Sequence, residues 1–95
     1  MNDKAPAPVS IVIPVFNEAE NIQALMHRML PVLEGMNRPF EVILVDDGSR
    51  DDSLALMKGF LTRPEVKVVE LTRNYGQHAA IFAGFSQVCG EIVVT

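Results

Sequence analysis

The chain has 95 residues, of which 48% are hydrophobic and 21% are charged, and its formal net charge is -4 at pH 7. These values are typical of one soluble globular domain, and they exclude a disordered tail and argue against binding of nucleic acid through phosphate contacts. The sequence has no apolar run of the roughly 20 residues that span a bilayer, and its single cysteine, Cys89, excludes an internal disulfide and fits a reducing, cytoplasmic compartment.

An N-terminal arm is predicted to precede one folded domain. Residues 1–8 lack a basic start followed by a long apolar core, which excludes a secretory signal or membrane anchor and predicts a loose arm. Strand and helix patterns alternate over residues 9–95, which we interpret as a single domain. Its first strand covers residues 9–15, because these side chains are mostly β-branched and Pro14 ends the ladder of hydrogen bonds there.

A helix is predicted after this strand. Apolar residues recur at intervals of three and four from Ile22 to Met36, and we expect Asn17 to cap the helix N-terminus. Pro31 removes one backbone hydrogen bond, which predicts a kink or a break. The second strand, residues 40–45, is mostly apolar and does not alternate with polar residues, which indicates that both of its faces are buried.

Two adjacent carboxylates, Asp46 and Asp47, follow the second strand directly. Gly48 comes next, so an ordinary Asp-Gly turn is the simplest interpretation. The buried strand in front of it favours a ligand site instead, because open α/β sheets bind ligands at the carboxyl ends of their strands. Ser49, with Asp52 three residues later, predicts a capping box for the second helix.

The remaining elements continue the alternation. Residues 66–71 form a third strand that is less completely apolar and therefore nearer a sheet edge, residues 77–88 form a helix with a face of small side chains, and residues 91–95 begin a fourth strand. This alternation predicts an α/β fold, a parallel open sheet with helices on both faces and the strand order 3-2-1-4. Ligands then belong at the carboxyl ends of the first and fourth strands.

The connection after the first strand lacks the glycines of known phosphate loops. Residues 14–18 contain no Gly-x-Gly-x-x-Gly turn, and the chain has no Gly-Lys-Ser or Gly-Lys-Thr. Glu18 and Asp47 would repel a diphosphate unless a divalent cation intervened. Carboxylates at this edge suit ribose hydroxyls or base N–H groups, and Phe16 or the backbone beside Pro14 offers the base a flat surface.

Three stretches in chain order, residues 9–18, 45–51 and 73–85, resemble the successive motifs of family 2 glycosyltransferases, which have the GT-A fold. Within the family, the third stretch is most similar to bacterial polyprenyl-phosphate sugar transferases. It resembles in particular the undecaprenyl-phosphate formamido-arabinose transferases of lipid A modification in the cell envelope, with dolichyl-phosphate mannose synthases as broader relatives. The chain then corresponds to the N-terminal, nucleotide-binding half of such a domain.

The resemblance implies a nucleotide-diphospho-sugar donor, with a UDP-sugar favoured, and a polyprenyl phosphate acceptor for a longer parent protein. It assigns eight residues to the donor: Pro14, Phe16, Glu18, Val45, Asp46, Asp47, Arg73 and Asn74. Asp47 is the candidate for the base and Glu18 for the ribose, while Asp46 supports the pocket or stabilises the turn. For Arg73 and Asn74, a solvated turn remains an equal alternative.

The resemblance places the catalytic apparatus outside this chain. The family's Asp-x-Asp motif, which holds a divalent cation (Mg²⁺ or Mn²⁺) on the donor diphosphate, is expected directly after Thr95. The chain alone would then bind no metal and contribute no catalytic residue, and a parent with C-terminal membrane helices would act at the cytoplasmic face of the inner membrane. Two alternatives stay open: a non-catalytic nucleotide-binding module and, less favoured, a phospho-acceptor domain like those of response regulators, which the paired aspartates suggest.

Overall fold

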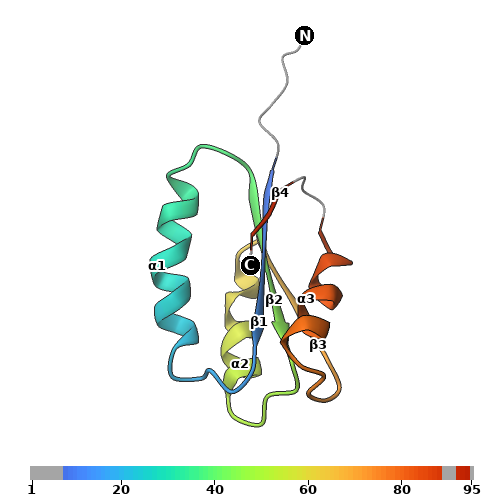
Figure 1. Cartoon of the computed structure of the whole chain (residues 1–95). Coiled ribbons are helices and arrows are strands. Elements are labelled where there is room, and N and C mark those ends of the chain that lie inside the picture. Colours follow the sequence, from blue (N-terminus) through green and yellow to red (C-terminus); the bar gives the residue numbers. More distant parts are fainter. Residues whose placement is uncertain (1–7, 89–91, 95) are drawn as a thin grey trace.

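A computed structural model describes residues 8–88 and 92–94 of the chain, in which helices and strands alternate (Figure 1). In chain order the elements are β1 (Val9–Val15), α1 (Ile22–Glu34), β2 (Phe40–Asp46), α2 (Ser53–Lys58), the 3-10 helix η1 (Gly59–Thr62), β3 (Val66–Glu70), α3 (Gln77–Phe85) and β4 (Ile92–Val94). The expectations for residues 1–7 of the arm and for Cys89 lie outside the described residues.

The sheet has four parallel strands in the order β3-β2-β1-β4, which confirms the predicted order. β1 pairs with β2 over its whole length, from Val9 opposite Phe40 to Val15 opposite Asp46. β3 lies at an edge of the sheet, as its less apolar sequence predicted. Because all strands run in the same direction, the connections that follow β1, β2 and β3 leave the sheet from one end (Figure 1).

Helices cover both faces of the sheet, as predicted (Figure 1). On one face α1 and α2 bury a core cluster that includes Met26, Leu44 and Met57, and on the other face α3 packs against the strands through a cluster that includes Val45 and Ala80. β2 contributes side chains to both clusters, which accounts for its apolar sequence. Over residues 8–88 and 92–94, the helices are too short or too polar to cross a membrane.

α3 lies close to the sheet because Gly84 has no side chain. A Cβ at this position would overlap Cγ1 of Val12 and would lie 3.0 Å from Cγ2 of Val45. The outer face of α3 carries Phe82 and Phe85, whose residues are 72% and 42% exposed. The predicted face of small side chains is therefore the face that contacts the sheet.

Two predicted helix caps are wrong. α1 begins at Ile22, and Asn17 lies in the preceding connection with a φ of 53°, where its side-chain oxygen accepts a hydrogen bond from the Arg50 amide at 2.8 Å. α2 begins at Ser53, so Ser49 is too far from it to be its cap. Both side chains bind a neighbouring connection instead, which local sequence rules do not consider.

Of the kink or break predicted at Pro31, the break does not occur. α1 continues through Pro31 to Glu34, and the proline lies on the exposed side of the helix. The missing hydrogen bond costs on the order of 3 kcal/mol in a regular helix. Leu30 and Leu33 stay buried in the same turns. Their burial contributes about 3 to 6 kcal/mol, which offsets that cost.

Candidate functional site

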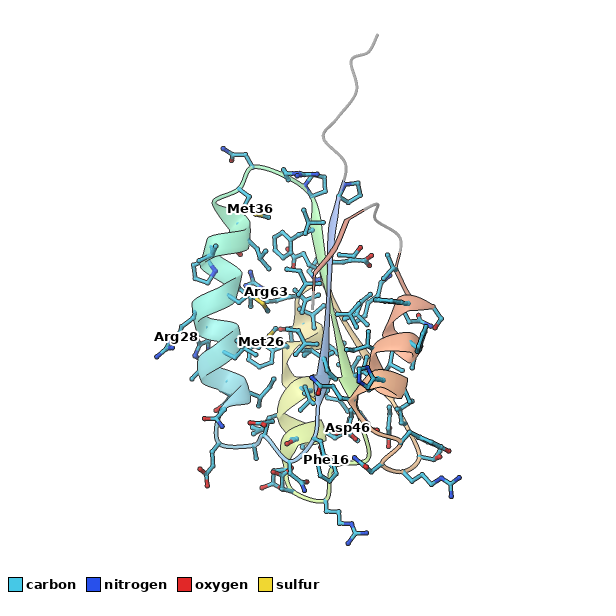
Figure 2. The ribbon with its side chains drawn as sticks, in the orientation of Figure 1. Phe16, Met26, Arg28, Met36, Asp46 and Arg63 are labelled. Carbon is cyan, nitrogen blue, oxygen red and sulfur yellow. The ribbon has the colours of Figure 1, made fainter. Side chains whose placement is uncertain are left out.

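Three connections meet at the carboxyl end of the sheet. They follow β1 (residues 16–21), β2 (residues 47–52) and β3 (residues 71–76), and they lie at the same end of the molecule (Figure 1). Figure 2 shows Phe16 and Asp46 at this end, as expected for side chains that follow or end neighbouring parallel strands.

Side chains of the β2–α2 connection and of Ser53, the first residue of α2, hold the backbone of the β1–α1 connection. Three backbone amides donate to side-chain oxygens across the gap: Asn17 to Ser49 Oγ at 2.9 Å, Glu18 to Ser53 Oγ at 2.7 Å and Ala19 to Asp51 Oδ2 at 3.2 Å. The Ser53 hydroxyl lowers the pKa of Asp51 below its usual value, and the amides of Ser53 and Ala19 add to this effect. The polar residues after β2 therefore fix the position of the loop that carries Glu18.

The carboxylate of Asp47 holds the third connection. Asp47 is 3% exposed, its Oδ1 accepts a hydrogen bond from the Tyr75 amide at 2.8 Å, and its Oδ2 accepts one from the Gly76 amide at 3.0 Å. The side-chain nitrogen of Asn74 donates to Oδ2 and to the carbonyl oxygen of Asp47, both at 3.1 Å. Hydrogen bonds to a carboxylate are stronger than neutral ones, so they fix Asp47 and the β3–α3 connection together.

Asp46 and Gly48 shape the turn itself. Asp46 is 2% exposed, and both of its carboxylate oxygens lie 3.3 Å from the Ser49 amide that donates to them. Gly48 has a φ of +75°, and a Cβ there would overlap the backbone of Arg73 and Asn74. Only glycine allows this turn to contact the β3–α3 connection so closely.

Two cavities are each lined by residues of all three connections. The first cavity has a volume of about 300 Å³ and is lined by Pro14, Val15, Phe16, Glu18, Asp47, Asn74, Gly76 and Gln77. The second cavity, of about 540 Å³, lies between the β2–α2 and β3–α3 connections. Phe16 and Asn74 line both cavities, so they form a common wall.

The eight residues predicted for the site are divided among three places. The first cavity contains five of them: Pro14, Phe16, Glu18, Asp47 and Asn74. Asp46 and Arg73 line the second cavity. Val45 lines neither, because its side chain is buried in the cluster beneath α3. The other residues that line the first cavity, which are Val15, Gly76 and Gln77, are not among the eight, although Gly76 and Gln77 lie close in sequence to the predicted Arg73 and Asn74.

The rim of the first cavity is polar and partly exposed. Phe16 is 43% exposed, and Oε1 of Glu18 accepts a hydrogen bond from the Asn21 side chain at 3.0 Å. Outside this cavity, the guanidinium carbon of Arg73 lies 4.9 Å from the ring centroid of Tyr75. Thr72 and Arg73 lower the pKa of Tyr75 through hydrogen bonds to its phenol oxygen.

The described residues do not form a metal site. No group of three or more His, Cys, Asp or Glu side chains within residues 8–88 and 92–94 could hold a metal ion. The lining of the first cavity contains two carboxylates, those of Glu18 and Asp47, and the second of these is already bound by the β3–α3 connection. What the first cavity does offer is an aromatic face beside carboxylate acceptors, an arrangement that suits a planar ring with N–H groups and neighbouring hydroxyls.

Sequence comparison relates this chain to proteins of known class. The family model for glycosyl transferase family 2 matches residues 10–95. The chain is 51% identical over 89 residues to undecaprenyl-phosphate 4-deoxy-4-formamido-L-arabinose transferase of Sodalis glossinidius (strain morsitans), and 50% identical over 90 residues to the protein of that name from Pseudomonas savastanoi pv. phaseolicola (strain 1448A / Race 6). Each match covers 92% of this chain but only 27% or 26% of the relative, so the chain spans about a quarter of these relatives.

Solved structures show the same fold. The mannosyltransferase PcManGT from Pyrobaculum calidifontis, in complex with GDP-Man and Mn²⁺, is similar with a TM-score of 0.71 and 26% identity, over 96% of this chain and 27% of that chain. S. aureus TarS 1–349 in complex with UDP is similar with a TM-score of 0.73 and 28% identity, over 90% of this chain and 25% of that chain.

Proposed function

The chain belongs to glycosyl transferase family 2, and on that premise we propose that it is the nucleotide-binding part of an enzyme that transfers a sugar from a nucleotide-diphospho-sugar to a polyprenyl phosphate. The observation that carries this proposal is the first cavity, where Phe16, Glu18 and Asp47 surround a volume of about 300 Å³ at the carboxyl end of the sheet. The names of the relatives support a polyprenyl phosphate acceptor, and PcManGT and TarS, which are similar in fold, hold nucleotide ligands.

Each predicted site residue has a role in this proposal. Phe16 and the backbone at Pro14 face the base, Asp47 accepts its ring N–H, and the exposed carboxylate of Glu18 accepts hydrogen bonds from the ribose hydroxyls. Asn74 holds Asp47 in place. The other three act from outside the first cavity: Asp46 through the turn, Val45 through its packing beneath α3 and Arg73 from the second cavity.

The acceptor capacity of Asp47 favours a uridine carrier. A carboxylate oxygen offers about two acceptor positions. Oδ2 accepts hydrogen bonds from Asn74 and Gly76, which fill both of its positions, and Oδ1 accepts one from Tyr75. Among the described residues, one acceptor position therefore remains open, and it lies on Oδ1. Uracil presents a single ring N–H, whereas guanine presents two adjacent N–H donors that pair best with both oxygens of a carboxylate. A UDP-sugar therefore fits this carboxylate better than a GDP-sugar.

The donor diphosphate also requires positive charge. A divalent cation would supply it by neutralising the leaving diphosphate. The described residues hold no group of three or more His, Cys, Asp or Glu side chains that fits such a cation, so we propose that its ligands lie outside residues 8–88 and 92–94. We propose the same for the catalytic residues, as the resemblance to the family implies. Because the proposed acceptor is a membrane lipid, we propose that the enzyme acts at a membrane, namely the cytoplasmic face of the inner membrane if a longer protein carries C-terminal membrane helices.

The alternatives make different predictions. A nucleotide-binding module without catalysis would bind the same ligand but would never form product in any longer protein that contains this chain. A phospho-acceptor domain is disfavoured by the family match and by the carboxylate of Asp47, which is buried and already accepts hydrogen bonds from Tyr75 and Gly76.

Calorimetric titration of the chain with UDP tests the proposal. We expect saturable binding with a dissociation constant within the range of about 1 μM to 1 mM that is usual for enzyme substrates. Phe16→Ala should raise this constant about two- to twelvefold, because an aromatic contact to the base contributes about 0.5 to 1.5 kcal/mol.

Phe82→Ala is the matched control, since Phe82 is an exposed phenylalanine on the outer face of α3 and lines neither cavity. Its dissociation constant for UDP should equal that of the wild-type chain. Equal weakening by both variants would place the ligand elsewhere.

A further inference from the structure

We propose that Asn74 is a specificity-determining residue that excludes guanine from the first cavity. The inference rests on the proposed function and adds to it the residue that makes the choice of nucleobase. Two independent observations meet at Asn74: its side chain occupies an acceptor position on Asp47, and it forms part of the wall between the two cavities.

The first observation concerns hydrogen bonding. The Asn74 side-chain nitrogen donates to Oδ2 of Asp47 at 3.1 Å, and the Gly76 amide donates to the same oxygen at 3.0 Å. The two bonds fill Oδ2. A guanine base that approached Asp47 with both of its N–H donors would need an open acceptor position on each carboxylate oxygen. It would therefore have to displace the donor of Asn74 or of Gly76 from Oδ2. Gly76 donates from the backbone at the start of α3, so Asn74 is the donor that a substitution can remove.

The second observation concerns volume. A purine has one more ring than a pyrimidine, and the first cavity holds about 300 Å³. The second cavity, of about 540 Å³, lies directly behind Asn74 and Phe16, which line both. A shorter side chain at position 74 would join the two cavities on the side of Asp47. Asn74 therefore limits both the number of N–H donors that a base can pair with Asp47 and the size of the base that the first cavity holds.

The position of Asn74 is fixed by contacts that do not depend on its side chain. Its backbone lies so close to Gly48 that a Cβ at Gly48 would overlap it. The backbone amides of Tyr75 and Gly76 donate to Asp47 whether or not the Asn74 side chain is present. Truncating the side chain should therefore leave the connection in place. A change in nucleotide preference in an Asn74 variant can therefore be distinguished from a general loss of structure.

The test is the ratio of the GDP and UDP dissociation constants, measured by calorimetry on the whole chain. We expect the wild-type chain to bind UDP more tightly than GDP. Asn74→Ala should lower the GDP-to-UDP ratio by at least about tenfold, since one hydrogen bond to a charged group corresponds to about a factor of 10 to 150. Asn74→Ser, which also removes the amide donor but keeps a polar side chain, should change the ratio in the same direction and serves if the alanine variant does not fold.

His78→Ala is the matched control, because His78 is an exposed side chain near Asn74 that lines neither cavity. Its ratio should equal that of the wild-type chain. A purely structural role of Asn74 would weaken the binding of both nucleotides equally and leave the ratio of their dissociation constants unchanged. If both Asn74 variants keep the wild-type ratio while the wild-type chain binds UDP, this inference is overturned and the proposed function is not. A wild-type chain that binds neither nucleotide overturns the proposed function and this inference with it.

Discussion

Gly48→Ala is expected to destabilise the fold by about 2 to 6 kcal/mol and to abolish nucleotide binding. The left-handed backbone at this position, with φ +75°, is strained for any residue that has a Cβ. That Cβ would in addition overlap the backbone of Arg73 and Asn74, which cannot rotate away as a side chain can. Because a domain of this size is stable by only about 5 to 15 kcal/mol, the expected loss is a large part of the total.

Urea denaturation of the wild-type chain and the variant measures this effect. Gly59→Ala is the matched control, because Gly59 has a φ of -62° and a Cβ there would meet nothing within 4 Å. It should leave the free energy of unfolding unchanged or raise it by about 0.4 to 1 kcal/mol. Equal unfolding midpoints for Gly48→Ala and the wild-type chain would show that the turn and the β3–α3 connection do not pack as described.

Asp47→Ala is expected to weaken UDP binding about 100-fold or more. Two losses combine: the base loses an acceptor for its ring N–H, which is worth about 1.5 to 3 kcal/mol for a charged group, and the β3–α3 connection loses the carboxylate that fixes it. The Tyr75 and Gly76 amides lose their acceptor, so the free energy of unfolding should also fall by about 1 to 3 kcal/mol. Calorimetry measures the first effect and urea denaturation the second.

Asp52→Ala controls for the loss of one negative charge beside the site. Asp52 is exposed and makes no side-chain hydrogen bond to the N-terminus of α2. Its variant should bind UDP as the wild-type chain does. UDP binding that survives Asp47→Ala without loss would contradict the assignment of the first cavity.

The architecture could be predicted because it depends on patterns that act over a few residues. The apolar sequence of β2 predicted a strand buried on both faces, and the predicted face of small side chains on α3 is the one that contacts the sheet at Gly84. The strand order followed from the alternation of strands and helices with short connections. These signals are strong because the burial of side chains has the same periodicity as the backbone.

The roles of the polar residues could not be predicted in this way. Local rules made Asn17 and Ser49 helix caps, whereas the Asn17 amide donates to Ser49 across 32 positions of sequence. Asp47 was predicted as a ligand-binding residue, but its second role, which is to accept hydrogen bonds from donors 27 to 29 residues later in the chain, was not predicted. A polar side chain takes the partner that the fold brings to it, and that partner becomes known only when three connections are placed together.

The most direct test of the nucleotide site is to map the backbone amide chemical shifts of the chain during titration with UDP. If the first cavity binds the nucleotide, the shifts should saturate and should be largest at Phe16, Glu18, Asp47, Gly76 and Gln77, which line it. Saturating shifts centred on Arg50, Leu54 and Thr72, which line only the second cavity, would contradict the assignment, as would the absence of any saturating shift at millimolar UDP.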